Sequence, residues 1–343
     1  MCTCKGVNGT MGKLASEELK KLLKCIRKDP RVLVPPKVGY DAGVHLLGDK
    51  YLVVSTDPCI GVPEEWFGWL LINYAASDVA LFGAKPEFCT VNLLAPLTMK
   101  PSGFQTIMKQ VCCAADELNM AIVRGHTGTY DGLSKTLGVC TAYGTVAKEK
   151  MITPGNAKAG DLIMCTKAVG FETLINFSLT CKSFAKRLFG TQEAEQLMNL
   201  VKMESCVREA LALAEIGGVH ALHDATEGGL TNALNEVAEA SSLGFRIEFD
   251  ALPITTEMNA LQKKFGLSLE QVLSASSTGM IVGAVDKQAQ KIVEETLRKQ
   301  GVPASFIGTF TKSKDRVLMW SSGCTSFPRV ADDPYSTILS SKV

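Results

Sequence analysis

Residues 224–230, Asp-Ala-Thr-Glu-Gly-Gly-Leu, place a carboxylate, a hydroxyl and two glycines directly before an apolar stripe with helical spacing. Glycines at the start of a helix let the backbone approach a bound group closely, and the free N–H groups there favour anions. A carboxylate beside them can hold a divalent cation, which in turn holds phosphates. The stretch therefore predicts Asp224 as a metal ligand and catalytic residue. It also predicts Thr226, Gly228 and Gly229 as residues that bind a cofactor's phosphates.

A second interpretation of the same stretch is structural. Asp224 and Glu227 have the spacing of a capping box, in which Asp224 would only cap the helix that follows. Short motifs carry a high risk of false positives, so the stretch by itself leaves both interpretations open.

Two further carboxylates flank a predicted hairpin. Residues 44–47 and 51–56 have the pattern of two strands, and Gly48-Asp49 between them is a hairpin turn signal. Asp41 stands just before the first strand and Asp57 just after the second. We therefore expect both carboxylates at the same end of a sheet.

Asp78 falls on the apolar face of a helix predicted over about residues 65–82. A carboxylate on a buried face is costly unless it is paired, hydrogen-bonded or bound to a metal. It could bond to nearby backbone or to an Arg. We favour a metal because Asp41 and Asp57 offer companion ligands.

A polar loop is expected at residues 124–128, Arg-Gly-His-Thr-Gly, after a strand at about 120–123. Several carboxylates, a Gly-His-Thr loop and a glycine-rich helix start are the parts needed to bind a nucleotide through Mg²⁺. No Gly-x-x-x-x-Gly-Lys-Ser/Thr motif occurs, which excludes a P-loop enzyme.

The elements that must position these residues run β-β-α-β-α-β-β between residues 44 and 146, after a basic amphipathic helix at 13–28. The polar stretch 148–160 carries Pro154, Gly155 and Gly160, so the predicted domains are residues 1–150 and 151–343. The second domain is expected to contain helices at about 171–186, 191–214, 228–242 and 287–300. Strands are expected at about 161–166, 280–285 and 304–310, and residues 323–343 are expected to form a loose tail.

Composition excludes several classes of protein. The net charge of +1 over 343 residues gives no electrostatic signature of nucleic-acid or membrane binding, and no apolar run approaches the length of a membrane span. No signal peptide is recognisable, and the twelve scattered cysteines do not form a disulfide or zinc pattern, so a cytoplasmic location is expected. The four histidines are too dispersed to predict a cluster.

In order along the chain, the motifs resemble those of the aminoimidazole-ribonucleotide synthetase superfamily, which includes thiamine-monophosphate kinase, selenophosphate synthetase and a carbamoyl-dehydrating hydrogenase-maturation protein. The stretches that carry the resemblance are residues 40–44, 55–58, 76–86, 125–127, 160–161 and 224–230. The similarity is greatest to the hydrogenase-maturation branch, through Glu-Gly-Gly-Leu at 227–230 and Leu-Asn-Glu at 234–236.

This resemblance implies an α/β (α+β) fold of two domains. The sheet of the N-terminal domain would pair with that of a second subunit into a dimeric β-barrel, and the C-terminal domain would be α+β. It also implies ATP and Mg²⁺ as cofactors, a homodimer and a maturation partner protein. Asp41, Asp78 and Asp224 would be metal ligands, Asp57 would lie near the nucleotide phosphates, and His126 and Thr127 would line the site. His126 would act with Asp224 in catalysis, and the basic N-terminal segment would form a flap.

Two departures from the family pattern affect the predicted function. Carbamoyl-dehydrating members end in Pro-Arg-Ile-Cys, whereas Pro-Arg-Val at residues 328–330 is followed here by Ala-Asp-Asp-Pro, which argues against carbamoyl-acceptor chemistry. Cys2, Cys4 and Lys5 resemble the Cys-x-Cys-Lys of selenophosphate synthetases, although we favour a chance pair of cysteines at a frayed terminus.

The predicted function is therefore an ATP- and Mg²⁺-dependent enzyme that phosphorylates or activates an amide, a carbamoyl group or a phosphate-bearing small substrate. The alternatives are a selenophosphate-synthetase-like phosphotransferase and a non-catalytic nucleotide-binding protein that serves in maturation or assembly.

Overall fold

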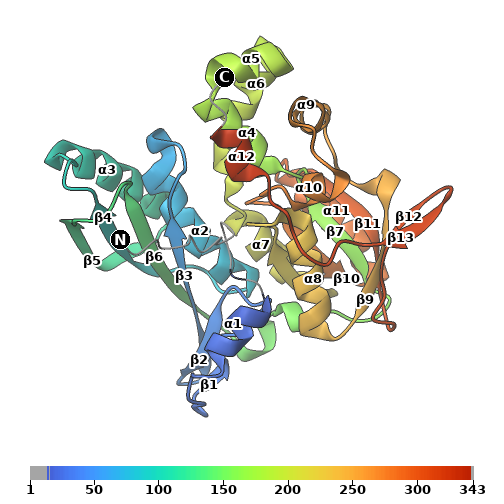
Figure 1. Ribbon diagram of the computed structural model, residues 1–343. Helices are drawn as coiled ribbons and strands as arrows, with labels where there is room; N and C mark the ends of the chain where they lie inside the picture. The colour runs from blue at the N-terminus through green and yellow to red at the C-terminus, as the bar shows by residue number, and fades with distance from the viewer. Residues whose placement is uncertain (1–13, 15, 341–343) are drawn as a thin grey trace, which may run out of the picture.

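The computed structural model describes residue 14 and residues 16–340, so Cys2, Cys4 and Lys5 lie outside the described residues. Two mixed sheets organise the chain, one of six strands and one of seven. Figure 1 shows the first sheet with its helices on the left and the second on the right. The connection between them, residues 147–161, contains two short 3₁₀ turns, Lys148–Lys150 and Pro154–Asn156. The domain boundary proposed at residue 150 falls within this connection.

The first sheet has the strand order β1-β2-β3-β6-β4-β5, so β5 lies at an edge. Its strands are β1 (Val32–Val34), β2 (Gly43–Leu47), β3 (Lys50–Cys59), β4 (Phe88–Ala95), β5 (Ala121–Thr129) and β6 (Leu137–Val146). Buried and half-buried residues alternate along β6, as expected for a strand with one face against a core. The accompanying helices are α1 (Ser16–Leu23), α2 (Phe67–Leu81) and α3 (Pro101–Leu118).

The helix α2 joins the two halves of the molecule. Every residue of α2 except Tyr74 is buried, as expected for a helix that is apolar around most of its circumference. It packs against β3 and β6 on one side and against α7 (Val207–Ala214) and β8 (Val219–Asp224) on the other. Asp78 lies on this helix and is therefore held between the two sheets.

The second sheet has the order β13-β12-β9-β11-β7-β10-β8. Its remaining strands are β7 (Leu162–Thr166), β9 (Gly244–Glu248), β10 (Ile281–Val285), β11 (Ala304–Thr311), β12 (Arg316–Trp320) and β13 (Gly323–Ser326). The other helices are α4 (Phe171–Thr180), α5 (Lys182–Phe189), α6 (Thr191–Asn199), α8 (Gly229–Ser241), α9 (Thr256–Phe265), α10 (Leu269–Ser274), α11 (Gln290–Lys299) and α12 (Tyr335–Leu339). One buried core includes Val53 and Leu70 of the first half together with Leu213 and Ile281 of the second.

The expected order of strands and helices between residues 44 and 146 is confirmed, but four local predictions were wrong. The loop expected at 124–128 lies within β5, because it pairs along its length with β4. The two long helices expected at 171–186 and 191–214 are each divided, the first at Cys181, whose ψ of 44° is not helical, and the second by a 3₁₀ turn.

The fourth error concerns the C-terminal segment, which is not a loose tail. Residues after 323 form β13 and α12, and Phe327 and Ile338 are buried in the core of the second half. None of the helices within residues 16–340 combines the length and apolar character that crossing a membrane requires.

Candidate functional site

Four carboxylates from different parts of the chain meet where the two sheets face each other. Asp41 precedes β2, Asp57 lies in β3, Asp78 lies on α2 and Asp224 ends β8. We call these four residues the carboxylate cluster. The pKa of Asp78 is raised well above its usual value, first by burial and then by the negative charges of Asp57, Asp224 and Asp41. Charges that repel one another this strongly lie close together, so the fold brings all four predicted aspartates into one site.

Asp224 is not the cap of the helix that follows it. It ends β8 opposite Ile281 of β10. The helix α8 begins five residues later with Gly228 at its N-cap position and without a side-chain cap. The capping-box interpretation was therefore wrong. One carboxylate oxygen of Asp224, Oδ1, is buried and has no hydrogen-bond partner within the described chain.

Ser55 ties the hairpin to α2. Its hydroxyl lies 2.7 Å from Oδ2 of Asp78 and 3.0 Å from the carbonyl oxygen of Asp41. Asp78 also shares a side-chain hydrogen bond with Asp57, which contributes to its raised pKa because the bond favours the protonated carboxyl. The hairpin and the helix therefore hold their carboxylates in fixed relative positions.

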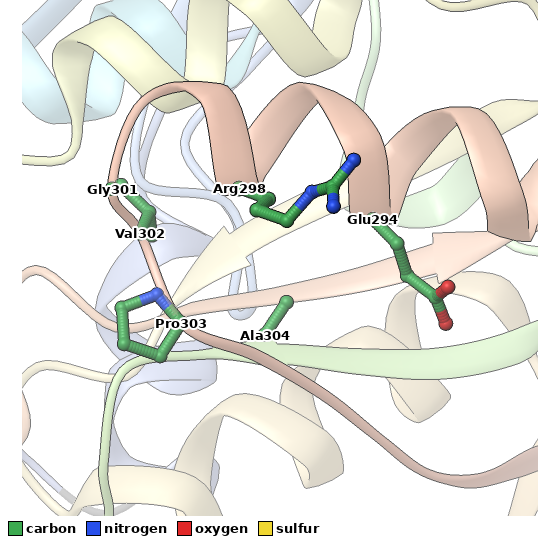
Figure 2. Close-up of a pocket in the computed structure, with 6 residues that line it drawn as sticks. All are labelled: Glu294, Arg298, Gly301, Val302, Pro303 and Ala304. Carbon is green, nitrogen blue, oxygen red and sulfur yellow. The ribbon is translucent and has the colours of Figure 1, made fainter.

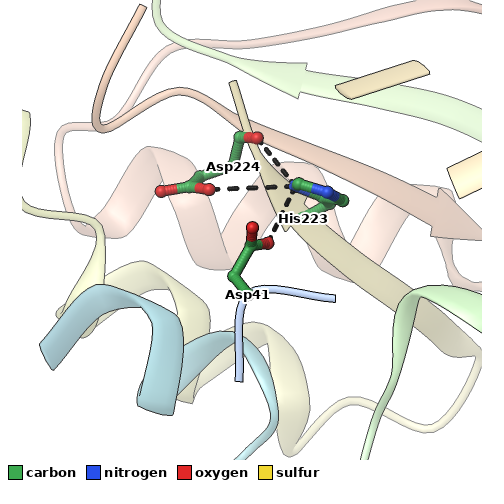
Figure 3. Close-up of side chains that lie close together, drawn as sticks. All are labelled: Asp41, His223 and Asp224. Carbon is green, nitrogen blue, oxygen red and sulfur yellow. Dashed lines mark hydrogen bonds and ion pairs between the residues drawn. The ribbon is translucent and has the colours of Figure 1, made fainter. Parts of the chain in front are cut away.

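His223 contacts two members of the carboxylate cluster, Asp41 and Asp224, and the sequence analysis missed it. Figure 3 shows its ring between Asp41 and Asp224. Its Nδ1 is 3.1 Å from Oδ2 of Asp41 and 2.8 Å from the carbonyl oxygen of Asp224, and its Nε2 is 2.9 Å from Oε2 of Glu236 on α8. The side chain is 1% exposed.

The carboxylates around His223 determine its charge. Burial lowers the pKa of the imidazole, but Asp41, Asp224 and Glu236 together outweigh burial, and the pKa is raised well above its usual value. His223 is therefore a buried imidazolium that orients the carboxylates around it. The sequence did contain a signal for His223. It is a histidine next to Asp224 in an apolar strand, with Glu236 on the helix that follows.

The donor set fits a hard divalent cation. Carboxylate oxygens are the ligands that Mg²⁺ prefers, and Asp41 and Asp224 offer ligand atoms within 4.8 Å of each other. A bound cation would give Oδ1 of Asp224 the partner that it lacks among the hydrogen-bond donors of the described chain. It would also reduce the repulsion between Asp78 and the neighbouring carboxylates. His223 also lies within this 4.8 Å group, but as an imidazolium it has no free lone pair for a metal.

The structure does not bring His126 to the carboxylate cluster. Strand pairing places His126 in a row with Asn92, Val139 and Pro58, whereas Asp57 is in the adjacent row and points to the other face of the sheet. Three strand spacings separate His126 from Pro58, or roughly 14 Å.

His126 is exposed and hydrogen-bonds to the hydroxyl of Tyr130, and Thr127 is exposed beside it on the edge strand β5.

Thr226, Gly228 and Gly229 form the turn between β8 and α8, directly after Asp224. Both glycines have positive φ, 79° and 52°. A Cβ at Gly229 would lie 2.4 Å from the carbonyl oxygen of Ala275, so only glycine fits this close approach of two backbone segments. The turn therefore lies directly after Asp224 in the chain, and its glycine N–H groups donate to Asp333 from Gly228 and to the carbonyl of Thr226 from Gly229.

A buried acid outside the carboxylate cluster gives a pH-dependent prediction. Glu172, in the first turn of α4, accepts hydrogen bonds from Thr278 (2.5 Å) and Tyr74 (3.3 Å), and burial raises its pKa to about 7. A carboxyl group whose pKa rises on folding destabilises the folded state as the pH rises from about 4.5 to 7. We expect Glu172→Gln to remove this loss, which is at most about 3 kcal/mol.

Thermal unfolding at several pH values tests this prediction. The melting temperature of Glu172→Gln should exceed that of the wild type at pH 8, and the difference should shrink or reverse at pH 5. The exposed Glu149→Gln should show no such pH-dependent difference. The same melting-temperature difference for Glu172→Gln at both pH values would contradict the assigned ionisation.

A separate cavity of about 320 Å³ lies between the end of α11 and the start of β11. Figure 2 shows Glu294 and Arg298 on one side and Pro303 and Ala304 on the other. None of its lining residues belongs to the carboxylate cluster. This cavity is therefore separate from the carboxylate cluster.

Comparisons with known proteins agree with this architecture. The chain matches the family models "AIR synthase related protein, N-terminal domain" over residues 39–146 and "AIR synthase related protein, C-terminal domain" over residues 158–321. It is 28% identical over 286 residues to a putative hydrogenase expression/formation protein of Methanocaldococcus jannaschii, covering 81% of this chain and 82% of the relative.

A second relative and a solved structure extend the comparison. The chain is 26% identical over 345 residues to a selenide, water dikinase of Bdellovibrio bacteriovorus, covering 91% of this chain and 95% of the relative. It superposes with a TM-score of 0.70 and 20% identity on a crystal structure of the hydrogenase maturation protein HypE in complex with ATP, covering 95% and 97% of the two chains. The predicted two-domain fold is confirmed.

Proposed function

The chain belongs to the AIR synthase-related family, and from that premise we propose that it is an enzyme that uses ATP and Mg²⁺ to activate an oxygen of a small substrate by phosphorylation. The substrate class is an amide, a carbamoyl group or a phosphate ester. The observation that carries the proposal is the convergence of Asp41, Asp57, Asp78 and Asp224, with one oxygen of Asp224 left without a hydrogen-bond donor.

In this proposal Asp41, Asp78 and Asp224 hold Mg²⁺ and Asp57 faces the nucleotide phosphates. Bound Mg²⁺ would neutralise negative charge on the phosphoryl group as it is transferred. The Nδ1 of His223 pairs with the carboxylate of Asp41 and hydrogen-bonds to the backbone carbonyl of Asp224, so His223 holds both residues in place before the nucleotide arrives. In this proposal Gly228 and Gly229, together with Thr226, let the nucleotide phosphates approach the backbone of the turn closely.

The relatives support the use of a nucleotide. A homologous fold has been crystallised with ATP, and a relative that is similar over nearly its whole length is named as a dikinase. A similar fold has been crystallised as a HypE–HypF complex, which supports a maturation partner protein for this chain.

We propose that the chain acts as a homodimer that pairs through β5. This edge strand is exposed over almost its whole length, and it presents the apolar side chains of Ile122 (37% exposed) and Val123 (56% exposed). A long exposed apolar edge is a template for pairing with another strand. His126 and Thr127 lie on the same edge, so we propose that they reach the nucleotide site through the dimer.

Val123→Lys tests the proposed interface. We expect the wild type to sediment as a dimer and Val123→Lys as a monomer, because a lysine on the paired edge brings like charges together across the interface. Ile292→Lys, on the exposed face of α11, is the matched control and should remain dimeric. A monomeric wild type, or a dimeric Val123→Lys, would argue against this interface.

Phosphate release tests the enzymatic proposal. Purified protein is incubated with Mg²⁺ and ATP alone and with a panel of carboxamides, carbamoyl compounds and phosphate esters. We expect stimulation of phosphate release by at least one class and none with Mg²⁺ replaced by a chelator. If thermal-shift assays show nucleotide binding but no compound of the panel stimulates phosphate release, a non-catalytic assembly protein would instead be favoured.

A second candidate function is a selenophosphate-synthetase-like phosphotransferase, which the similarity to the selenide, water dikinase favours. In this case Cys2, Cys4 and Lys5 would act on the selenium substrate. Selenide-dependent ATP consumption that disappears in Cys2→Ser and Cys4→Ser would select this candidate. ATP consumption that does not depend on selenide would exclude this second candidate function.

A further inference from the structure

Three side chains of metal-ligand type meet at the end of the second sheet that lies away from the carboxylate cluster. The strands β7, β10 and β8 are neighbours in that order, and each pair is antiparallel. Asp161 directly precedes β7, Asp286 directly follows β10, and His220 is the second residue of β8. All three therefore lie at one end of the sheet, and we call them the strand-end cluster. Asp224 ends β8 roughly 13 Å further along the strand from His220.

The backbone directs these side chains over the end of β10. The pairing of β10 with β8 shifts register between Ala284 and Val285, and His220 is the residue that this shift leaves without a partner. Such a bulge turns a side chain away from the direction that a regular strand would give it. The N–H of Asp286 donates to the carbonyl oxygen of Gly218 at 2.7 Å, which holds the end of β10 beside the start of β8.

The ligand atoms of the strand-end cluster are close enough to share one ion. One atom from each of Asp161, His220 and Asp286 lies within 4.8 Å of the other two. Nδ1 of His220 is 3.0 Å from Oδ1 and 2.9 Å from Oδ2 of Asp161. Two ligands of one zinc ion lie at most roughly 4.4 Å apart, since each is about 2.0–2.2 Å from the metal. Small side-chain movements therefore suffice to bring all three residues into coordination.

His220 is a neutral imidazole, which is the form that binds metals. The ammonium group of Lys158 lies 2.9 Å from its Nε2. Because an ammonium group can only donate, Nε2 accepts with its lone pair, and the ring proton is on Nδ1 and is donated to Asp161. The side chain of Lys158 is exposed. When it turns away, the proton can move to Nε2, which leaves the lone pair of Nδ1 for an ion.

The two carboxylates of the cluster have only neutral hydrogen-bond donors among the described residues. Asp161 is 4% exposed and accepts from the backbone N–H of Lys158 at 2.7 Å and from the ring of His220. Asp286 accepts through Oδ1 from the backbone N–H of Gln288 at 2.8 Å, and its Oδ2 has no hydrogen-bond or ion-pair partner within residues 16–340. Like charges this close repel each other, so a cation held between them would stabilise the folded protein.

The donor set favours a first-row transition metal ion over Mg²⁺. It combines carboxylate oxygens with an imidazole nitrogen, and imidazole suits zinc and its neighbours in the series, whereas Mg²⁺ prefers oxygen ligands alone. The side chain of His220 is 17% exposed, and with Lys158 it lines a cavity of about 340 Å³. A hydrated ion can therefore reach the ring from solvent.

We propose that Asp161, His220 and Asp286 form a second metal site, which binds Zn²⁺ or a similar divalent transition metal ion. Water would complete the coordination of the ion. Asp161 ends the connection between the two sheets, so the ion would fasten this connection to β10 and β8. The proposal does not rest on the use of ATP, because the carboxylate cluster lies at the other end of β8.

Calorimetric titration with Zn²⁺ in the presence of excess Mg²⁺ tests the site. The Mg²⁺ competes for the carboxylate cluster, so that Zn²⁺ reports on the site that contains nitrogen. We expect a binding step in the wild type that weakens at least about tenfold in Asp286→Asn, which keeps the oxygen that accepts from Gln288 but removes the charge. His220→Gln should lose the step because no ring nitrogen remains. Asp315→Asn, on the exposed turn before β12, is the control and should bind like the wild type.

Lys158→Met separates a metal site from a hydrogen-bond network that only supports the fold. The network would be weakened by this change, whereas Zn²⁺ affinity should rise by up to about tenfold, because one hydrogen bond no longer competes for the ring of His220. Weaker Zn²⁺ binding by Lys158→Met would contradict coordination through Nδ1.

The comparison of variants decides the proposal. All of them keep every cysteine, so a Zn²⁺-binding step at cysteines would persist in His220→Gln and Asp286→Asn. Zn²⁺ should also raise the melting temperature of the wild type more than that of His220→Gln, since a ligand bound only by the folded state stabilises it. Absence of a Zn²⁺-binding step in the wild type, or equal Zn²⁺ affinities of the wild type, Asp286→Asn and His220→Gln, would overturn the proposal.

Discussion

Replacement of Asp224 by Asn is expected to lower ATP-dependent turnover by at least about 100-fold without destabilising the folded protein. A metal ligand that neutralises charge in the transition state contributes several kcal/mol, which corresponds to a rate factor of this order. Asparagine keeps the shape of the side chain but offers no negative charge to Mg²⁺. Steady-state phosphate release at saturating ATP and Mg²⁺ measures the loss.

The expected stability of Asp224→Asn distinguishes a site residue from a structural one. The charge of Asp224 raises the pKa of Asp78, and its Oδ1 has no hydrogen-bond donor among the described residues, so removal of the charge relieves repulsion. The free energy of unfolding without metal should change little, because the relieved repulsion with Asp78 opposes the lost attraction to the His223 imidazolium. Asp49→Asn, on the exposed hairpin turn, is the control for both measurements. Unchanged turnover in Asp224→Asn would rule out its metal role, and loss of folding would mark it as structural.

Replacement of His223 by Gln is expected to destabilise the protein by about 3 kcal/mol, because removal of one partner from a buried ion pair leaves the opposite charges uncompensated. Asp41 and Glu236 would both lose the imidazolium that lies about 3 Å from them. Urea unfolding in the presence of a chelator measures the loss. Mg²⁺ should restore more stability to His223→Gln than it adds to the wild type, since a cation then replaces the missing positive charge.

His220→Gln provides a matched control on the same strand. His220 pairs with Asp161 at 2.9 Å, but its side chain is 17% exposed and it lies outside the carboxylate cluster. Its loss should cost about 1 to 2 kcal/mol, typical of its hydrogen bonds to Asp161 and Lys158, and should not change the response to Mg²⁺. If His223→Gln destabilises the protein no more than His220→Gln does, His223 does not hold the carboxylates in place.

The carboxylates of the site could be predicted because local patterns report them. The hairpin signal at Gly48-Asp49 placed Asp41 and Asp57 at one end of a sheet, and helical periodicity placed Asp78 on a buried face. The order of elements between residues 44 and 146 followed from the same periodicities.

Long-range contacts determined what the sequence analysis missed. His223 and Glu236 become an ion pair only when α8 packs beside β8, which no local pattern encodes. Strand pairing with β4, not the glycines and polar residues of 124–128, determines the conformation around His126. Asp333 appeared to belong to a loose tail because its partners, Gly228 and Ser276, lie more than fifty residues away in sequence.

The central claim is that the aspartates gathered between the two sheets bind a nucleotide through a shared divalent cation. Calorimetric titration of the wild type and Asp224→Asn with a non-hydrolysable ATP analogue, with and without Mg²⁺, tests it most directly. The account predicts saturable binding heat for the wild type that requires Mg²⁺ and is lost in Asp224→Asn. Absence of heat in the wild type, or equal heat in both proteins, would contradict it.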